Sequence, residues 1–227
     1  MPNEHETTWE SFAGAVRLFP LPNLVIFPSI VQPLHIFEPR YRQMTEDALK
    51  GDRLIAMALL QKDWESDYLS EPEIYPVVCI SKIMAEQKLE DGRFNILVRG
   101  VKRARVRQEL TSEKLYRSAE VELLEEDHFD ESNLTSEYRR QLLAYAPLWY
   151  PDQPEVQEQF NKLNHSELPL NALCDVISFA LPLSVEQKQE LLTETDVERR
   201  VIQLLHHLQT KNPHGAKRPF PPTFSEN

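Results

Sequence analysis

The chain is poor in glycine, with five in 227 residues, at positions 14, 51, 92, 100 and 215. A phosphate-binding P-loop requires two glycines five positions apart followed by lysine, and the dinucleotide-binding fingerprint requires glycines two positions apart. No pair of glycines in the sequence has either spacing. The sequence therefore excludes both nucleotide-binding motifs.

Cysteine is also scarce, and other signatures of catalysis are missing. Cys79 and Cys174 are the only cysteines, and they lie too far apart for the ligand spacing of a zinc site. Each follows apolar residues, which predicts two buried, reduced thiols. The sequence contains neither a Gly-x-Ser-x-Gly elbow nor a His-Glu-x-x-His motif. We therefore predict no enzymatic activity, no cofactor and no metal site.

The chain has no long apolar run and an excess of acidic residues. No segment approaches the about 18 consecutive apolar residues that a membrane span needs. The first ten residues, MPNEHETTWE, have none of the features of a targeting peptide, so we expect a cytoplasmic protein. The net charge of −11 would repel phosphates and argues against nucleic acid as a partner.

Residues 15–127 read mainly as β-strands, behind an N-terminal arm at 1–14. Asp91-Gly92 is the clearest hairpin turn, because both residues tolerate a positive φ. One helix is expected from Pro39 to Lys50, with Gly51 ending it and Tyr41, Met44 and Ala48 on one face. So many strands with little helical cover predict a strongly curved or closed sheet. The expected strands are 15–19, 24–27, 31–37, 53–61, 77–86, 93–107 and 115–124.

Residues 128–210 read as helices. The stretch 120–131 has seven acidic residues and neither Lys nor Arg, which is typical of a solvated boundary between two parts. Five helical segments follow, and Pro147 is expected to kink or end the first. Ser184 with Gln187, and Thr195 with Glu198, have the spacing of capping boxes that begin the last two. Residues 211–227 lack periodicity and are expected to be disordered.

A basic stretch in the β-rich half is a candidate anion site. It consists of Arg99, Lys102, Arg103, Arg105 and Arg107. Arg103, Arg105 and Arg107 should share one strand face, because side chains alternate with a period of two. One interpretation is a solvated outer face, with Ala104 and Val106 turned inward. The other is a strip that contacts RNA, although no stacking aromatic residues are interleaved with it.

An ordered set of motifs gives the sequence a family resemblance. In chain order they are LFPLPNLVIFP (18–28), PLHIFEPRYR (33–42), DGRFNIL (91–97), GVKRARV (100–106), LCDVI (173–177), EQKQELL (186–192) and DVERR (196–200). From residue 16 to 208 the chain resembles the N-terminal domain of Lon proteases, and especially its free-standing bacterial relatives. The resemblance implies an α+β fold, with a PUA-like β pseudo-barrel lobe followed by a C-terminal helical bundle.

The resemblance also implies a function. In Lon this domain recognises unfolded or tagged protein substrates, and the related domain of cereblon is a scaffold for partner proteins. The present sequence departs from Lon in lacking the ATPase motifs and the Ser-Lys peptidase dyad. The leading hypothesis is therefore a non-enzymatic polypeptide-binding module, which binds client proteins or presents them to a separate protease or chaperone.

The segment from Pro33 to Tyr41 is the candidate polypeptide-binding site, because it mixes aromatic and charged side chains. The candidate residues are His35, Phe37, Glu38, Arg40 and Tyr41. Ordinary packing, the start of a helix or a local salt bridge would explain the same residues. The alternative function is that of an RNA-binding PUA-like protein, which would use the basic stretch around Arg103.

Overall fold

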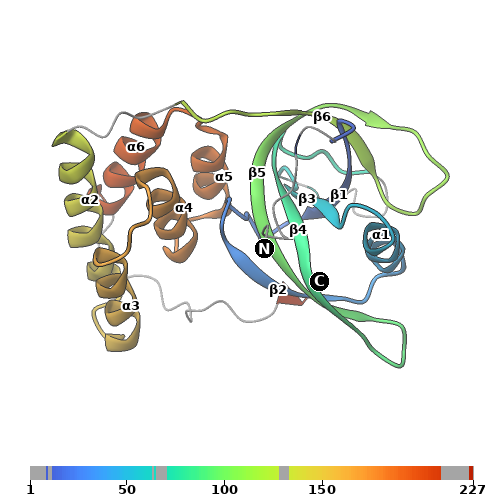
Figure 1. Cartoon of the computed structure of the whole chain (residues 1–227), viewed down its shortest axis with the longest axis horizontal. Coiled ribbons are helices and arrows are strands. Elements are labelled where there is room, and N and C mark those ends of the chain that lie inside the picture. The colour runs from blue at the N-terminus through green and yellow to red at the C-terminus, as the bar shows by residue number, and fades with distance from the viewer. Residues whose placement is uncertain are drawn as a thin grey trace, which may run out of the picture.

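The strands, together with one helix, lie on one side of the molecule, and the remaining helices lie on the other (Figure 1). The computed structural model describes residues 9, 12–62, 64, 71–127, 133–210 and 225–226. The expected arm at 1–14 falls mostly outside the described residues. So does the expected disordered tail, apart from the short strand β7 (Ser225–Glu226).

The strands form one mixed sheet that closes on itself. Its order is β4-β3-β1-β6-β5-β2-β7, and β4 also pairs with β5, so that five strands complete a ring. β1 runs parallel to β3, and the other pairs within the ring are antiparallel. This closure agrees with the expected closed sheet. The strands are β1 (Ala15–Leu21), β2 (Val31–Ile36), β3 (Leu54–Leu59), β4 (Val77–Lys88), β5 (Phe94–Leu110) and β6 (Ser118–Leu123).

Strand β5 is the element around which the sheet bends. The first half of its 17 residues pairs with β2 and with the C-terminal part of β4. The second half pairs with β6 and with the N-terminal part of β4. Its pairing shifts register near Ser81 of β4, opposite Gly100, and again beyond Val106. Such bulges bend a strand and increase its twist, which lets β5 pair with different strands along its two halves.

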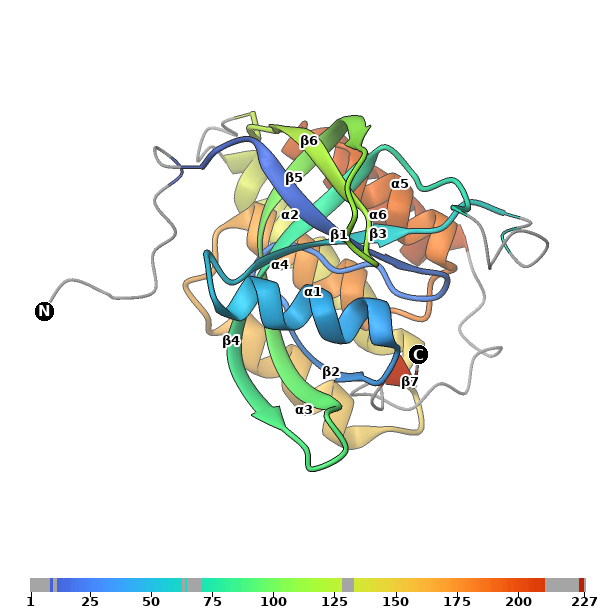
Figure 2. The ribbon, with the colours of Figure 1, turned by 90° about the vertical axis from the view of Figure 1, so that its right-hand side faces the viewer.

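Helix α1 (Pro39–Leu49) connects β2 to β3 and covers one side of the sheet. Tyr41, Met44 and Ala48 are buried on its inner face, as their spacing predicted. In Figure 2, α1 lies in front of the strands and the other helices lie behind them.

The expected five helices are present in the second half of the chain. They are α2 (Asn133–Tyr145), α3 (Pro154–Asn164), α4 (Leu170–Ala180), α5 (Val185–Thr193) and α6 (Val197–Thr210), with a short 3-10 helix, η3 (Ala146–Trp149), after α2. The capping box of Ser184 and Gln187 begins α5 as predicted. The second predicted box is wrong, because the carboxylate of Asp196, and not Thr195, accepts the backbone N–H of Arg199 at 3.0 Å.

One predicted strand is absent. Residues 24–27 form no strand, although Val25, Ile26 and Phe27 are at most 3% exposed. The carbonyl of Phe27 lies so close to Gly100 that a Cβ on this glycine would stand 2.1 Å from its oxygen. The apolar run is therefore a core-filling loop packed onto the β5 bulge.

The core is continuous from sheet to helices. The larger cluster of buried side chains includes Phe19, Met57 and Val98 from the strands, and Leu173 and Leu204 from the helices. A second cluster occupies the opposite face of the ring strands, so β3 is buried on both faces, as its apolar run predicted. Cys79 and Cys174 are free and buried, and burial raises the pKa of each thiol to about 12.

The close approach at Gly100 generates a stability prediction. Gly100→Ala should destabilise the protein by about 1–3 kcal/mol, because its methyl group would meet backbone atoms that cannot rotate away. The matched control is Gly51→Ala, whose Cβ would find its nearest neighbour at 3.6 Å. Urea denaturation of both variants would measure the difference, and equal free energies of unfolding would contradict the prediction.

Candidate functional site

Arg103 lies where β5 meets the helices, and its side chain is buried. It is 1% exposed. Its Nη1 and Nη2 donate to the two carboxylate oxygens of Asp175 on α4, at 3.0 and 2.6 Å. Its Nε donates to the carbonyl of Leu192 at 2.9 Å, and Nη1 also donates to Glu126 at 2.7 Å. One guanidinium thus joins the sheet to α4, to the end of α5 and to the connector between the two parts.

A second buried arginine completes this arrangement from the other side. Arg200 on α6 is 0% exposed and donates to Glu126 at 2.6 Å and to the carbonyl of Glu194 at 2.6 Å. Its Nε lies 3.5 Å from Asp175. We call Arg103, Glu126, Asp175 and Arg200 the interlobe ion cluster. Two cations and two carboxylates balance one another within it.

The pKa values of the cluster reflect the competition between burial and charge. Burial raises the pKa of Asp175, and the charges of Arg103 and Arg200 oppose this shift without reversing it. Burial would also raise the pKa of Glu126, but the charges of Arg200 and Arg103 outweigh it and hold that pKa below its usual value. The pKa of Arg103 is raised, because Asp175 and Glu126 overcome the effect of burial.

The structure therefore corrects the interpretation of the basic stretch. Arg103 neither lies on a solvated face nor is available to RNA, because α4 and α5 cover this part of β5. Arg99 and Arg105 are exposed. Lys102 pairs with Glu125 at 2.6 Å, and Arg107 pairs with Glu122. Nearby carboxylates divide the expected strip, so it is not a continuous cationic surface.

Two residues of the other candidate segment reach the surface at the end of β2. Phe37 is 41% exposed, and its ring stacks against that of His35 with centroids 6.3 Å apart. The His35 ring is held by Asn95 on β5, with Nδ1 at 2.7 Å from the amide oxygen. At the start of the same strand, Val31 is 49% exposed. These side chains form what we call the β2 surface: Val31, Pro33, His35 and Phe37.

The remaining candidates in this segment build the start of α1. Glu38 and Arg40 form an ion pair at 2.9 Å, and the guanidinium of Arg40 lies 4.7 Å from the centre of the Tyr41 ring. Tyr41 is 5% exposed and donates its hydroxyl to the carbonyl of Pro20 at 3.2 Å. Tyr41 is therefore a core residue, in contrast to the surface contact expected from the sequence.

Sequence reasoning missed two hollows in the surface. A polar cavity of about 500 Å³ lies beside the interlobe ion cluster, where Ser29, Lys102 and Asn171 are among its lining residues. An apolar groove of about 420 Å³ lies between α3 and α4. Neither has a signal in the sequence, because each depends on how separate elements pack together.

In the described part of the chain, no three His, Cys, Asp or Glu side chains gather in a way that would hold a metal ion. None of the described helices combines the length and apolar character that crossing a bilayer requires.

The ion cluster makes a strong prediction about stability. Arg103→Met should lower the free energy of unfolding by about 3–5 kcal/mol, because it leaves Asp175 buried without its main partner. The double variant Arg103→Met/Asp175→Leu should lose less than the sum of the two single losses, by about 1 kcal/mol or more. Arg105→Ala, two positions along the strand and exposed, is the control and should change stability by less than about 0.5 kcal/mol. Additive losses in denaturant titrations would contradict the coupling.

Glu126 gives a prediction about pH. Its pKa in the folded protein is below the usual value of 4.5, so its ionisation stabilises the fold. That contribution is complete above the unfolded pKa and is lost as the pH falls through the folded pKa. The stability difference between the parent protein and Glu126→Gln should therefore be larger at pH 7 than at pH 3. Glu125→Gln is the control, since Glu125 is 81% exposed, and urea titrations across this range would show the contrast. A difference that does not depend on pH would contradict the prediction.

Several known proteins are similar to this chain in sequence. The chain is 28% identical to Lon protease 2 of Herpetosiphon aurantiacus over an alignment of 207 residues that covers 86% of this chain and 25% of that protein. It is 28% identical to Lon protease 1 of Bacillus subtilis over 204 residues, covering 89% of this chain and 26% of that protein. The chain thus spans about a quarter of the length of these curated relatives.

Solved structures show the same fold. The crystal structure of a Lon N-terminal domain protein from Xanthomonas campestris superposes with a TM-score of 0.63 at 24% identity, covering 85% of this chain and 97% of that one. The N-terminal domain of a Mycobacterium avium complex Lon protease gives a TM-score of 0.66 at 22% identity, covering 86% and 98%.

A family model decides the assignment. The model of the ATP-dependent protease La (LON) substrate-binding domain matches residues 15–210, which include both the closed sheet and the five helices. The chain belongs to the family of Lon substrate-binding domains.

Proposed function

We propose that this protein is a non-enzymatic polypeptide-binding module of the cytoplasm, which binds unfolded or tagged client proteins through the β2 surface. In this proposal the ring of strands is a PUA-like pseudo-barrel and the five helices are a bundle that supports it. The module would act alone or as an adaptor for a separate protease or chaperone. Family membership supports substrate recognition in general, and the β2 surface carries the specific proposal.

The β2 surface combines exposed apolar side chains with a strand edge that β7 covers only in part. Val31 and Phe37 are exposed large apolar residues, and they lie at the start of β2 and directly after its end. Strand β2 pairs with β5 along one side. On its other side, within the described residues, it pairs only with β7, at Leu34 and His35. An edge of this kind can add an extended polypeptide, with backbone hydrogen bonds giving affinity and side chains giving specificity.

Pro33 fits such an edge. Proline has no backbone N–H to donate, so within sheets it is confined to edge strands, strand starts and bulges. Its carbonyl accepts the side-chain amide of Gln32 at 3.0 Å. Proline on an edge also limits indiscriminate pairing between copies of a protein. A client strand would therefore pair with Val31 and Gln32, before Pro33, because β7 already pairs with Leu34 and His35, and its apolar side chains would pack against Val31 and Phe37.

The ion pair of Glu38 and Arg40 has a supporting role in this proposal. It lies directly after Phe37, and Arg40 packs over the buried Tyr41. These contacts fix the first turn of α1 and thereby hold Phe37 at the surface. A side chain held in place loses less conformational entropy on binding.

The proposal predicts a loss of binding on removal of one aromatic ring. Phe37→Ser should weaken the binding of a reduced, carboxymethylated and therefore permanently unfolded protein by about tenfold, which corresponds to about 1.4 kcal/mol. Fluorescence anisotropy of the labelled unfolded protein would measure this. Leu115→Ser is the matched control, because Leu115 is a 63% exposed apolar residue in the β5–β6 loop. Equal affinities for the two variants would remove the β2 surface from the proposal.

A further inference from the structure

The groove between α3 and α4 is a second apolar surface, on the opposite part of the molecule from α1. Helix α3 packs against α2 and η3, and the groove separates part of it from α4. Val156 and Phe160 form the floor at 5% and 3% exposure, and the half-buried Leu163, Val176 and Ala180 form the walls. Its volume of about 420 Å³ lies within the range of roughly 300–1,000 Å³ that is typical of ligand sites.

One end of the groove is fixed by Arg139 of α2. Its guanidinium donates to the carbonyls of Leu163, Ser166 and Leu168 at 2.9, 2.5 and 2.8 Å. These carbonyls belong to the end of α3 and to the loop that leads into α4. The arginine thus satisfies backbone acceptors that a helix end leaves open, and it fixes the spacing of the two helices at their connection.

The other end is fixed by Tyr150. Its hydroxyl donates to the carbonyl of Ala180 at the end of α4, and its ring packs against Phe160 of α3 with centroids 6.1 Å apart. Both ends of the helix pair are therefore tied, while the middle stays open. A groove held in this way is formed before a ligand arrives, which lowers the entropic cost of binding.

The rim of the groove is acidic at the start of α3. Glu155 lines the groove and is exposed. Glu158, one turn further on, pairs with Lys162 at 3.0 Å. Asp152, just before the helix, is also exposed. At the end of α4, Lys188 is held by the carbonyl of Phe179 at 2.6 Å. Of the described residues that line the groove, Glu155 is the one that is charged, in a chain of net charge −11, so the lining favours a ligand with positive charge.

From these observations we infer that the α3–α4 groove is a docking site for an apolar polypeptide segment flanked by Lys or Arg. Apolar side chains of the segment pack on Phe160 and Val176, and the basic residue lies beside Glu155. This inference deepens the proposed function, on which it rests, by naming a class of client segment. It concerns a surface separate from the β2 surface, so the two can be tested apart.

The test uses three labelled peptides of about 12 residues, the length of a helix that lies along such a groove. All carry the same Leu and Phe positions, and they differ in having two Lys, two Glu or two Gln residues beside them. At low salt the Lys peptide should bind the full-length protein at least tenfold more tightly than the Glu peptide, with the Gln peptide between them. The differences in affinity among the three peptides should become smaller as salt is added, since exposed charges are screened. Equal affinities for the Lys and Glu peptides would overturn the inference.

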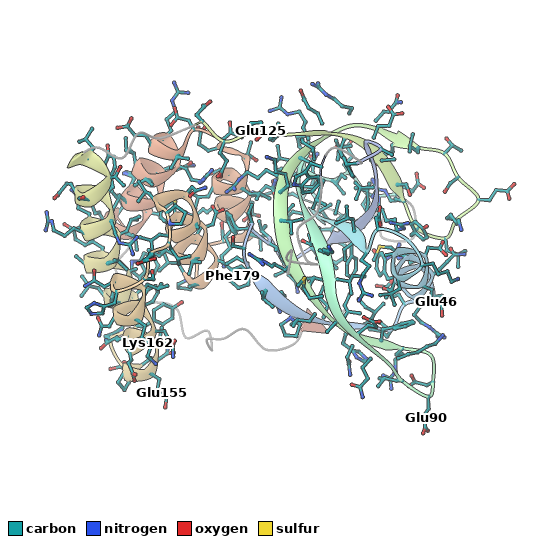
Figure 3. The ribbon with its side chains drawn as sticks, in the orientation of Figure 1. Glu46, Glu90, Glu125, Glu155, Lys162 and Phe179 are labelled. Carbon is teal, nitrogen blue, oxygen red and sulfur yellow. The ribbon has the colours of Figure 1, made fainter. Side chains whose placement is uncertain are left out.

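Two variants assign the binding to the groove. Val176→Trp fills it and should weaken the Lys peptide at least tenfold. Glu155→Lys leaves the apolar lining intact and should reduce the preference for the Lys peptide about threefold, which is the scale of one exposed charge pair. Glu90→Lys, with the same charge change, is the control on the β4–β5 turn, at the far end of the molecule from Glu155 (Figure 3). It should leave the preference unchanged.

The outcomes separate this inference from the proposed function. If Phe37→Ser abolishes binding of the unfolded protein while Glu155→Lys and Val176→Trp leave the peptides unaffected, the groove is excluded and the β2 surface stands. If the groove variants reduce peptide binding and Phe37→Ser has no effect, the groove stands and the β2 surface is excluded. Identical effects of Glu155→Lys and Glu90→Lys would show that net charge alone attracts the peptide, and would overturn the docking site. Because Glu155→Lys alters only an exposed side chain, it remains informative even if Val176→Trp fails to fold.

Discussion

The contact between the sheet and the helices depends on the two buried arginines. Arg103 comes from the middle of β5 and Arg200 from the first turn of α6, and they share Glu126 and Asp175. Apolar side chains would hold the two parts together in several relative positions, because dispersion and hydrophobic contacts have little direction. Two guanidinium groups donating to two carboxylates accept only a narrow range of geometries. The ion cluster therefore selects one orientation among those that the apolar core would allow.

The net contribution of such a cluster to stability is smaller than its contacts suggest. Removing four charged groups from water costs free energy that their mutual attraction only partly recovers. The cluster instead disfavours other arrangements of the two parts, since any displacement of the helices would leave a buried charge without a partner. The same logic explains Arg139, whose guanidinium satisfies three backbone carbonyls at once. Arginine fixes the geometry at both places.

Much of the architecture could be predicted from the sequence. Alternation and continuous apolar runs located six of the seven expected strands, and spacing located the helices, because these patterns follow from burial on one or two faces. The ordered motifs led to the family. The run at 24–27 was misread because its apolar residues fill the core from a loop, and a short apolar run has no periodicity that separates the two. Asp196 displaced Thr195 as a cap because both residue types serve in that position.

The candidate site was harder to predict, and for a physical reason. Strand periodicity correctly places Arg103 and Arg105 on the same side of β5, but it does not reveal that α4 and α5 cover only the first of them. The same limit applies to Tyr41, whose ring is buried while Phe37 is exposed. The groove between α3 and α4 follows from an interhelical distance, which the sequence of either helix leaves undetermined. The face of a strand or helix on which a residue lies follows from the local sequence. Whether another element packs over that face depends on the tertiary structure.

The pairing of β1 has a consequence for how the protein is made. Arg17 of β1 lies opposite Ile55 of β3 on one side and Ser118 of β6 on the other. More than half of the chain is therefore synthesised before β1 can pair with both of its neighbours. Asp175 and Arg200, the partners of Arg103 in the ion cluster, are synthesised later still. Contacts between distant parts of a chain form slowly, and strand edges that are still unpaired are prone to aggregate. During its own synthesis, a protein proposed to bind unfolded chains passes through a state that resembles its clients.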